Sequence, residues 1–369
     1  MRFIYNFNIV LITFVIFCAA CTTPVFIEKV TFRADTAIDD FLSMVDYIDA
    51  VPLEDDGCHY VGSMPELHLC GADYIIVDKL NQLVYRYSES GGFLNEIGKK
   101  GNGPQEFLTV DNIQVFDNGT VNIYSRPDMV LTYSANGVFL SVAQIKDRGL
   151  QSFTVNDGVL TYYGNGTGRK SRLSYFKGDM SDTLLSGSDK VMNFTSQTPI
   201  FSRLSDNSVS VLDSYSPIIY RYDGEKLSPY IELDFMNTAV PDTYYAQEDP
   251  FSASDLLLSR KFSMIRRYFE NGNYRFIETY TNNPDSMPDF KYAIYKGDEW
   301  KWFDVGEPAV SPLVSSFMCF DDDATLYAII DPVYMATCPQ EIIDKIRNKE
   351  AINSINDEDN HIILKIKLF

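Results

Sequence analysis

The sequence predicts an all-β protein folded as a six-bladed β-propeller with two short helical insertions. Three observations lead to this prediction: an internal repeat, runs that alternate apolar and polar residues, and many aromatic residues. The repeat is the most specific of them. Residues 74–94 and 120–140 align so that Tyr87 matches Tyr133, an offset of 46 residues (87 to 133). A repeat of this length, built from short strands and glycine turns, is typical of propeller blades.

The composition supports a strand-rich fold and excludes one class of partner. Of the 369 residues, 25 are Phe and 24 are Tyr, and such residues favour half-buried pleated surfaces. The formal net charge is −20. Because binding to nucleic acid needs clustered Lys and Arg against the phosphates, no nucleic-acid partner is expected.

The first 20 residues have the pattern of a secretory signal peptide. Arg2 provides a positive charge, residues 9–17 form an apolar run too short for a good membrane span, and two alanines precede Cys21. The end of this segment resembles a lipobox, in which the cysteine becomes the lipidated first residue, although Cys18 stands where that pattern has Leu. We therefore expect lipidation at Cys21. The alternatives are an ordinary signal with unmodified Cys21 and an uncleaved anchor.

This reading divides the chain into three parts. Residues 1–20 are the signal peptide, residues 21–45 a lipid-attached tether with a first strand, and residues 46–369 the propeller. The expected location is the outer membrane, reached through the N-terminal lipid. The protein would face either the periplasm or the cell surface, and the residues after Cys21 do not decide between them.

Short alternating runs separated by Gly, Asp and Asn turns fill six blades. The expected strands are 59–62, 67–70, 74–78 and 83–87; 113–116, 121–124, 130–133 and 138–142; 153–155, 160–163, 173–176 and 183–185; 208–212, 218–222 and 230–233; 273–281, 291–295 and 300–305; and 316–320, 325–330 and 361–369. A strand at the end of the chain suits ring closure by pairing with an N-terminal strand.

Two segments depart from the strand pattern and are the expected helical insertions. Residues 254–270 place apolar side chains at helical spacing. Residues 337–352 begin with Thr337 and Gln340 at the spacing of a capping box. We expect both helices to pack against the propeller, and the alternative is a lid or a groove for a partner.

Four cysteines follow Cys21, namely Cys58, Cys70, Cys319 and Cys338. In an oxidising compartment they can form disulfides, and short loops favour pairing Cys58 with Cys70 and Cys319 with Cys338. The alternative is that some are buried free thiols.

Several motifs together carry a family resemblance. They are VPLED at 51–55, GKKGNGPQEF at 98–107, a weaker match at 216–235 and DEDNHIILKIKLF at 357–369. The chain resembles the bacterial six-bladed β-propeller lipoprotein family, a relative of NHL-type propellers. Gln105 and Phe107 replace a Gly and a Tyr of the family turn, and His361 replaces its usual Pro. The resemblance implies a fold and an envelope location, but no activity, because the family has none in common.

The glycine-rich run is expected to be a structural connection between blades. It contains Gly98, Gly101, Gly103, Pro104 and Glu106. The third glycine of a dinucleotide fingerprint and the Lys-Ser/Thr ending of a P-loop are both missing. We expect Glu106 to accept hydrogen bonds from backbone N–H groups.

No metal site and no cofactor are expected. The three histidines, His59, His68 and His361, fall in separate predicted strands. Asp321–Asp323 lacks the spacing and the bidentate Glu of an EF-hand and is expected to be a turn.

The remaining candidate residues follow predicted strands or flank predicted loops. Candidate catalytic residues are Asp78, Arg126, Asp128 and Asp213, from turns between strands. Candidate ligand-binding residues are the aromatic side chains of Tyr244, Tyr245, Trp300 and Trp302. Stacking on a glycan or a peptide is the functional interpretation of these aromatics, and packing in the core is the alternative.

Two functions from different classes follow. The first is a lipid-anchored envelope propeller that acts as a binding or protein-interaction module, with a glycan or a protein as its partner. The second is a propeller enzyme, a polysaccharide lyase or hydrolase. Neither a nucleophile elbow nor a clustered histidine site supports catalysis, so the binding module is favoured.

Overall fold

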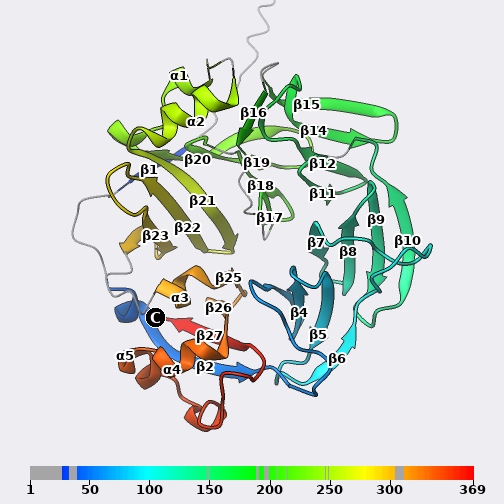
Figure 1. The fold of residues 1–369 in the computed structure, drawn as a ribbon, viewed down its shortest axis with the longest axis vertical. Helices are drawn as coiled ribbons and strands as arrows, with labels where there is room; N and C mark the ends of the chain where they lie inside the picture. The colour runs from blue at the N-terminus through cyan, green and yellow to red at the C-terminus, as the bar shows by residue number, and fades with distance from the viewer. Residues whose placement is uncertain are drawn as a thin grey trace, which may run out of the picture.

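In the computed structural model, six small sheets form a ring of blades around a common axis (Figure 1). This confirms the predicted six-bladed β-propeller. The structure describes residues 27–32, 40–147, 149–187, 191–194, 199–204, 206–213, 215–245, 247, 249–303 and 311–369. The expected signal peptide and Cys21 lie outside the described residues.

The first three blades follow one another along the chain, each from its inner strand to its outer strand. Blade one contains β3 (Glu66–Cys70), β4 (Asp73–Asp78), β5 (Leu83–Tyr87) and β6 (Phe93–Glu96). Blade two contains β7 (Asn112–Val115), β8 (Thr120–Ser125), β9 (Met129–Ser134) and β10 (Phe139–Gln144). Blade three contains β11 (Gln151–Val155), β12 (Gly158–Tyr162), β14 (Ser171–Lys177) and β15 (Met180–Ser186), with β13 (Asn165–Thr167) and β16 (Val191–Phe194) paired beside it.

Blades four and six both recruit a strand from the N-terminal part of the chain. Blade four contains β17 (Phe201–Arg203), β18 (Val209–Leu212), β19 (Ile218–Tyr222) and β20 (Leu227–Asp234), to which β1 (Glu28–Thr31) adds in parallel. Blade five contains β21 (Phe262–Asn271), β22 (Tyr274–Asn282), β23 (Asp289–Lys296) and β24 (Glu299–Phe303). Blade six contains β25 (Phe317–Phe320), β26 (Thr325–Ile330), β27 (Ile362–Leu368) and, as its outer strand, β2 (Val45–Pro52).

Helices are short and lie in the connections. They are η1 (Phe41–Met44), η2 (Met236–Thr238), α1 (Asp242–Tyr245), α2 (Pro250–Leu258), α3 (Ser311–Ser315), α4 (Pro332–Thr337), α5 (Gln340–Lys345) and η3 (Lys349–Ala351). The helix expected over 337–352 is therefore broken. Pro339 is the N-cap of α5, and the helix ends at Lys345, because Ile346 takes an extended conformation and bridges to Ile48 of β2.

The helix expected over 254–270 is wrong for most of its length. Helix α2 begins at Pro250 and ends at Leu258, and the chain then enters β21, the inner strand of blade five. Both faces of β21 are buried, because Phe262 packs on α2 while Ile265 and Tyr268 pack on the cluster between blades four and five. Burial of both faces, together with the bulge between Ile265 and Arg267, gives these apolar residues the three-residue spacing that imitates a helix.

The first blade was predicted one strand out of phase. Residues 59–62 are a loop rather than a strand, and β6 supplies the outer strand of that blade. Within this loop Val61 is buried and Tyr60 is exposed, and Asn360, which precedes the last strand, binds the loop backbone at His59 and Val61.

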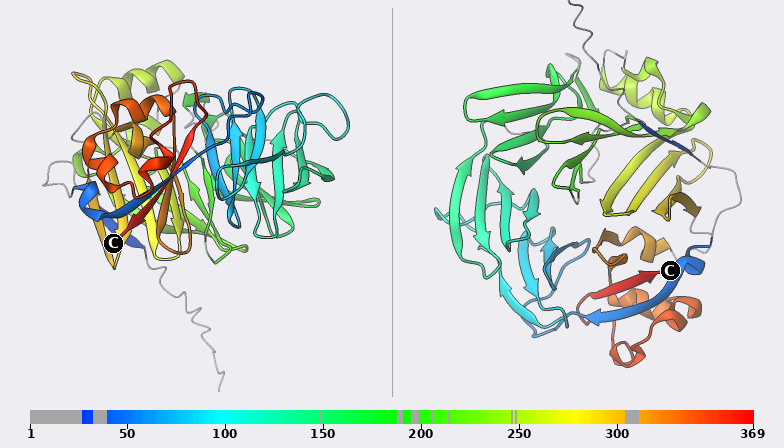
Figure 2. Two further views of the ribbon diagram at one scale, coloured as in Figure 1. Left: turned by 90° about the horizontal axis from the view of Figure 1, so that it is seen from below. Right: turned by 180° about the vertical axis from the view of Figure 1, so that it is seen from behind.

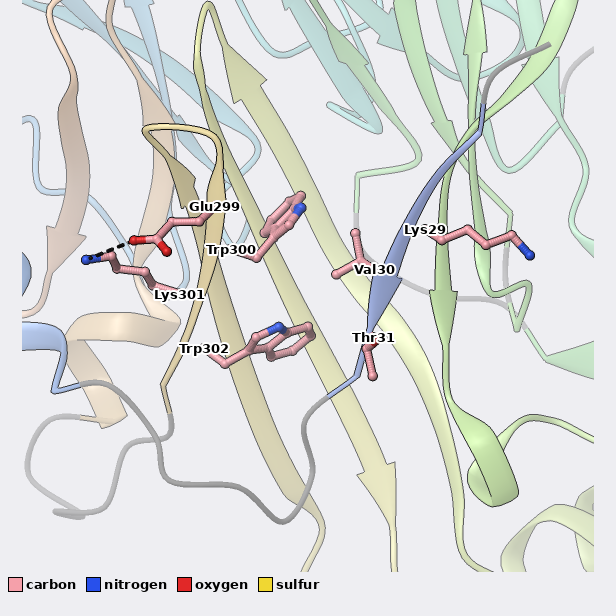
Figure 3. A pocket seen from close by; sticks show the side chains of 7 residues that line it. All are labelled: Lys29, Val30, Thr31, Glu299, Trp300, Lys301 and Trp302. Carbon is pink, nitrogen blue, oxygen red and sulfur yellow. Dashed lines mark ion pairs between the residues drawn. The ribbon is translucent and has the colours of Figure 1, made fainter. Parts of the chain in front are cut away.

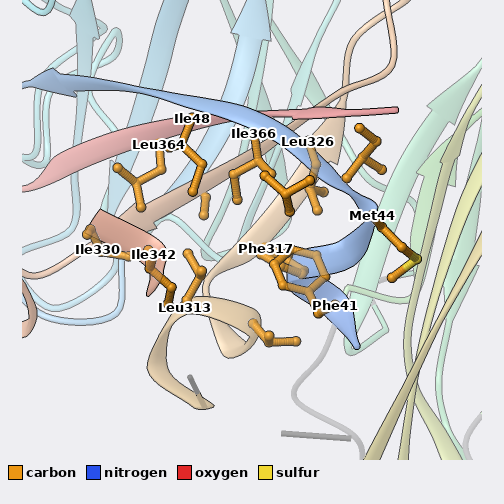
Figure 4. Close-up of a cluster of buried hydrophobic side chains, with 14 of the residues drawn as sticks. Phe41, Met44, Ile48, Leu313, Phe317, Leu326, Ile330, Ile342, Leu364 and Ile366 are labelled. Atoms are coloured by element: carbon orange, nitrogen blue, oxygen red, sulfur yellow. The ribbon is translucent and has the colours of Figure 1, made fainter. Parts of the chain in front are cut away.

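Ring closure joins the two ends of the propeller. Strand β2 pairs antiparallel with β27, from Val45 opposite Leu368 to Pro52 opposite Ile362. Between blades five and six, the pairing buries a large apolar cluster that includes Ile48, Leu364 and Ile366 (Figure 4). The predicted closure by an N-terminal strand is present, although the strand is β2 rather than the earlier β1.

The blades meet through apolar side chains at five of the six interfaces. Separate clusters join blades six and one, one and two, three and four, four and five, and five and six. Between blades two and three, the described residues form hydrogen bonds instead. Gln114 of β7 donates to the Thr154 carbonyl of β11 at 2.8 Å and accepts from its N–H at 3.0 Å. The side-chain amide therefore satisfies the inner edge of blade three as a neighbouring strand would.

We predict that the closing strand is essential for stability. Ile48→Ala removes a fully buried side chain that lies opposite Ile366, so it should lower the free energy of unfolding by about 2–5 kcal/mol. Chemical denaturation measures this. The control Leu140→Ala, at an exposed position of β10, should change stability by less than about 0.5 kcal/mol. Equal effects of the two variants would contradict the closing role of β2.

Candidate functional site at the loop mouth

The two ends of the propeller differ in how the chain crosses them (Figure 2). At one end, which we call the hairpin mouth, tight turns join the first strand to the second and the third to the fourth. Many of these turns need a left-handed residue, which glycine adopts without strain; examples are Gly71, Gly119 and Gly272. At the other end, the loop mouth, longer segments join strands two and three and connect successive blades. All five α-helices of the described chain lie in loop-mouth connections.

One loop-mouth segment, residues 53–65, is fixed by residues far away in sequence. The buried side chain of Asn360 donates to the carbonyls of Glu54 and His59, both at 3.1 Å, and accepts from the Val61 N–H at 3.2 Å. On the other side of this segment, the Gly62 N–H donates to Asp78 at 2.9 Å. The backbone on both sides of Tyr60 is therefore held in place.

Tyr60 is presented to solvent by these anchors. Its side chain is 44% exposed and lies over His361, with ring centroids 6.4 Å apart. Its partial burial, together with the charges of Asp331 and Asp55, raises the pKa of the Tyr60 hydroxyl. An exposed aromatic residue on an ordered loop is a feature expected of a binding surface.

His361 is almost fully enclosed beneath Tyr60. It is 3% exposed, and its Nδ1 atom has no hydrogen-bond partner among the described residues. Burial lowers the pKa of His361, against the opposing charges of Asp331 and Asp78. The imidazole is therefore neutral at pH 7.

A second group of polar side chains lies where blade one meets blade two. Lys79 donates to the carbonyls of Val110 and Asp111 and lies 3.4 Å from Glu66, while His68 Nε2 lies 3.8 Å from the same carboxylate. Burial alone would raise the pKa of Glu66, but His68 and Lys79 outweigh it and hold this pKa below its ordinary value. The group links the two blades, and it was not singled out from the sequence.

The candidate catalytic residues all lie at the loop mouth but do not come together. Asp78 ends β4 in blade one, Arg126 and Asp128 follow β8 in blade two, and Asp213 follows β18 in blade four. The Asp78 carboxylate accepts from the N–H groups of Gly62 and Asn81 and from the Asn81 side chain, so its oxygens are already used. Arg126 is exposed and lies 3.6 Å from Asp111. Asp128 adopts a φ of 105° in the turn between β8 and β9.

Asp213 belongs to a buried interaction between blades three and four. Its carboxylate pairs with Arg172 and accepts from the Tyr162 hydroxyl at 3.0 Å. Burial raises the pKa of Asp213, which Arg172 and Tyr162 oppose. A carboxylate that is buried and paired in this way joins the blades rather than facing a substrate.

The candidate aromatic residues also lie in separate parts of the structure. Tyr244 is fully buried against α2, next to Ala253 and Leu257. The side chain of Tyr245 lies outside the described part of the structure. Trp300 and Trp302 of β24 face β1 and line a groove of about 430 Å³ on the outer rim (Figure 3). Trp302 packs on the cluster between blades four and five, and Trp300 donates to Glu28 at 2.7 Å.

The glycine-rich run forms the connection from blade one to blade two. Glu106 accepts from the Gly103 N–H at 2.9 Å, and Gly101 donates to the Phe107 carbonyl at 3.0 Å. Gly98 has a φ of +70°, and a Cβ there would lie 2.7 Å from the Tyr133 ring. Pro104 lies in the same turn. The loop thus holds its shape through its own backbone and the Glu106 side chain.

The expected disulfide pairs are not formed. Cys58, Cys70, Cys319 and Cys338 are free thiols. Cys319 packs on the cluster between blades six and one, whereas Cys338 packs on the cluster between blades five and six, so their side chains enter different cores. Among the described residues, no group of three or more His, Cys, Asp or Glu side chains is arranged to hold a metal ion.

Comparisons with known proteins agree with the fold. The model of a family described as a domain of unknown function, DUF4934, matches residues 29–367. The crystal structure of a "putative exported protein" from Bacteroides fragilis NCTC 9343 superposes with a TM-score of 0.73 at 16% identity, covering 93% of this chain and 100% of the other. The crystal structure of a DUF4221 member from Bacteroides vulgatus superposes with a TM-score of 0.55 at 8% identity, covering 88% of this chain and 97% of the other. No functionally curated protein matches the sequence.

We predict that Asp78 acts in folding. Asp78→Ala leaves the Gly62 N–H and the Asn81 side chain without their acceptor, so it should lower the free energy of unfolding by about 1–3 kcal/mol. Denaturant titration measures the loss. Asp128→Ala, which changes the same kind of turn in blade two, is the comparison and should cost less. An unchanged stability of Asp78→Ala would contradict this role.

Proposed function

We propose that this chain, which belongs to the DUF4934 family, is a lipid-anchored propeller of the cell envelope that binds a ligand at its loop mouth. The observation that carries the proposal is the difference between the two mouths. Tight turns close one end, whereas every long connection and every α-helix of the described residues gathers at the other. Binding residues are commonly carried on loops that a rigid scaffold positions.

The carboxylates considered for catalysis support binding over catalysis. Asp78 is saturated by three hydrogen bonds from the protein itself, and Asp213 is buried with Arg172. Neither is placed as a free acid or base beside a second such group. A ligand that binds by contact with the loop surface fits this arrangement better than a propeller lyase or hydrolase does.

The N-terminal sequence supports the envelope location. A signal-like segment with a lipobox-like end precedes the propeller, and a structural neighbour from Bacteroides fragilis is described as exported. None of the helices in the described residues has the length and apolarity to cross a membrane. A lipid on Cys21 would provide attachment to the membrane.

The direction of β1 indicates how the proposed lipid anchor would orient the propeller relative to the membrane. Strand β1 runs parallel to β20, which leads from the hairpin mouth to the loop mouth. The N-terminal end of β1 therefore lies toward the hairpin mouth. Glu28 is seven positions after Cys21 (21 to 28), so the chain between them spans at most about 25 Å. A lipid on Cys21 would hold the hairpin mouth toward the membrane and turn the loop mouth away from it.

We predict that ligands protect the loop mouth. Purified residues 22–369 would be screened by thermal shift against oligosaccharides, peptides and divalent cations. A ligand at 100 times its Kd should stabilise the fold by about 2.7 kcal/mol. Hydrogen exchange with that ligand should then show protection in residues 53–65, 97–111 and 331–361. Protection confined to the hairpin turns, or to the Trp300 groove, would contradict the proposed site.

We predict that Cys21 carries the anchor. Full-length protein expressed in a Bacteroides host should fractionate with membranes and incorporate a labelled fatty acid. The Cys21→Ser variant should lose both properties while folding normally, because residue 21 precedes the propeller. The control Cys58→Ser changes an exposed thiol of the 53–65 loop and should leave them unchanged. Membrane attachment and labelling of Cys21→Ser equal to wild type would overturn the lipid anchor.

A further inference from the structure

We propose that Tyr60, together with Met64 and Leu80, forms a docking surface for a partner polypeptide that inserts a Lys or Arg side chain over the Tyr60 ring. We call these three residues the Tyr60 surface. The inference rests on the proposed function, since it assigns a partner chemistry to one part of the loop mouth. It follows from the exposure, the rigidity and the charge of this region.

The Tyr60 surface is apolar and open to solvent. Met64 is 81% exposed and Leu80 is 65% exposed, and Leu80 lies in the turn after Asp78, whose carboxylate binds the Gly62 N–H. Met64 also adopts a φ of 56°, a conformation that is uncommon for any residue except glycine. Exposed Tyr and Met side chains are enriched where proteins contact one another.

The surface is ordered before any partner arrives. Hydrogen bonds fix the backbone at His59, Val61 and Gly62, so the Tyr60 side chain is presented from an anchored segment. Binding to such a segment costs little conformational entropy, which leaves more of the contact energy for affinity.

The charges around Tyr60 select a cation. Asp331 follows Ile330, which pairs with Ile362, so it lies next to His361 at the end of the sheet, and Asp55 belongs to the same loop as Tyr60. Asp331 uses one oxygen to cap α4, at 2.9 Å from the Val333 N–H, and its charge is exposed. Carboxylates beside an open aromatic face attract an ammonium or guanidinium group through ion pairing and cation–π contact. With a chain net charge of −20, acidic partners are repelled.

His361 is a second, independent feature of the same place. It is 97% buried beneath the Tyr60 ring, and Nδ1 has no partner among the described residues. Because the imidazole is neutral, it does not repel a cation.

A random dodecapeptide phage library, selected on immobilised residues 22–369, tests the inference. The enriched peptides should carry Lys or Arg next to apolar residues and have a net positive charge. Fluorescence anisotropy of one such peptide then gives Kd for the variants. Tyr60→Ala should weaken binding about tenfold, whereas Tyr60→Phe, which keeps the ring, should bind nearly as wild type.

Charge and position are tested by two further variants. Asp331→Asn keeps an N-cap on α4 but removes the charge, so it should weaken binding about threefold and reduce the salt dependence. Leu140→Ala, an exposed apolar residue on the outer strand of blade two, should have no effect.

The following outcomes would overturn the inference. Peptides that bind Tyr60→Ala as tightly as wild type would place the contact elsewhere. If their protection in hydrogen exchange still falls on the loop mouth, the proposed function survives and only the Tyr60 surface fails. Enrichment of acidic or neutral peptides, an empty selection, or a neutral oligosaccharide whose binding is lost in Tyr60→Ala would refute a cationic polypeptide as the partner.

Discussion

The pairing of β2 with β27 is the interaction on which the rest of the molecule depends. It converts six sheets in a row into a ring and removes two open edges at once. It also brings Val45–Pro52 and the last strand together from ends of the propeller that are about 300 residues apart. The clusters on both sides of blade six, against blades five and one, contain residues of the closing strands. Losing the pairing would therefore expose two of the inter-blade cores.

The fold was predictable from the sequence because each blade of a propeller is built from the same pattern of short alternating strands. Alternating strands recur along the chain and the first two blades repeat with an offset of 46 residues, so the blade count was right although the first blade was one strand out of phase. Prediction failed where alternation was broken locally. In β21 both faces are buried and a bulge follows Ile265, so the apolar residues have a helical spacing, and only pairing with β22 shows that the segment is a strand. A single sequence does not show which segments pair as strands.

The hydrogen-bonded interface between blades two and three shows a second way to join blades. Asn112 and Gln114, on one face of β7, cap the carbonyls of Ser152 and Thr154 at alternating positions of β11. The buried Tyr124 hydroxyl bonds to Gln114 and to Thr154, and burial raises the pKa of Tyr124 to about 12. Such contacts are directional and need precise alignment, whereas apolar cores tolerate small shifts. This interface therefore fixes how two blades align, while the apolar interfaces contribute most of the burial.

The candidate site could not be found from the sequence because ring closure creates it. Asp78, a candidate catalytic residue from the sequence, lies at the loop mouth, but its hydrogen bonds to Gly62 and Asn81 indicate a structural role. The surroundings of Tyr60 are formed by Asn360 and His361, which are about 300 positions away, and the C-terminal motif that contains them does not show that they lie beside Tyr60. A partner that binds the Tyr60 surface therefore contacts residues assembled by both ends of the ring. By linkage, such binding stabilises the closed propeller, and any change that loosens the β2–β27 pairing weakens binding without touching the partner.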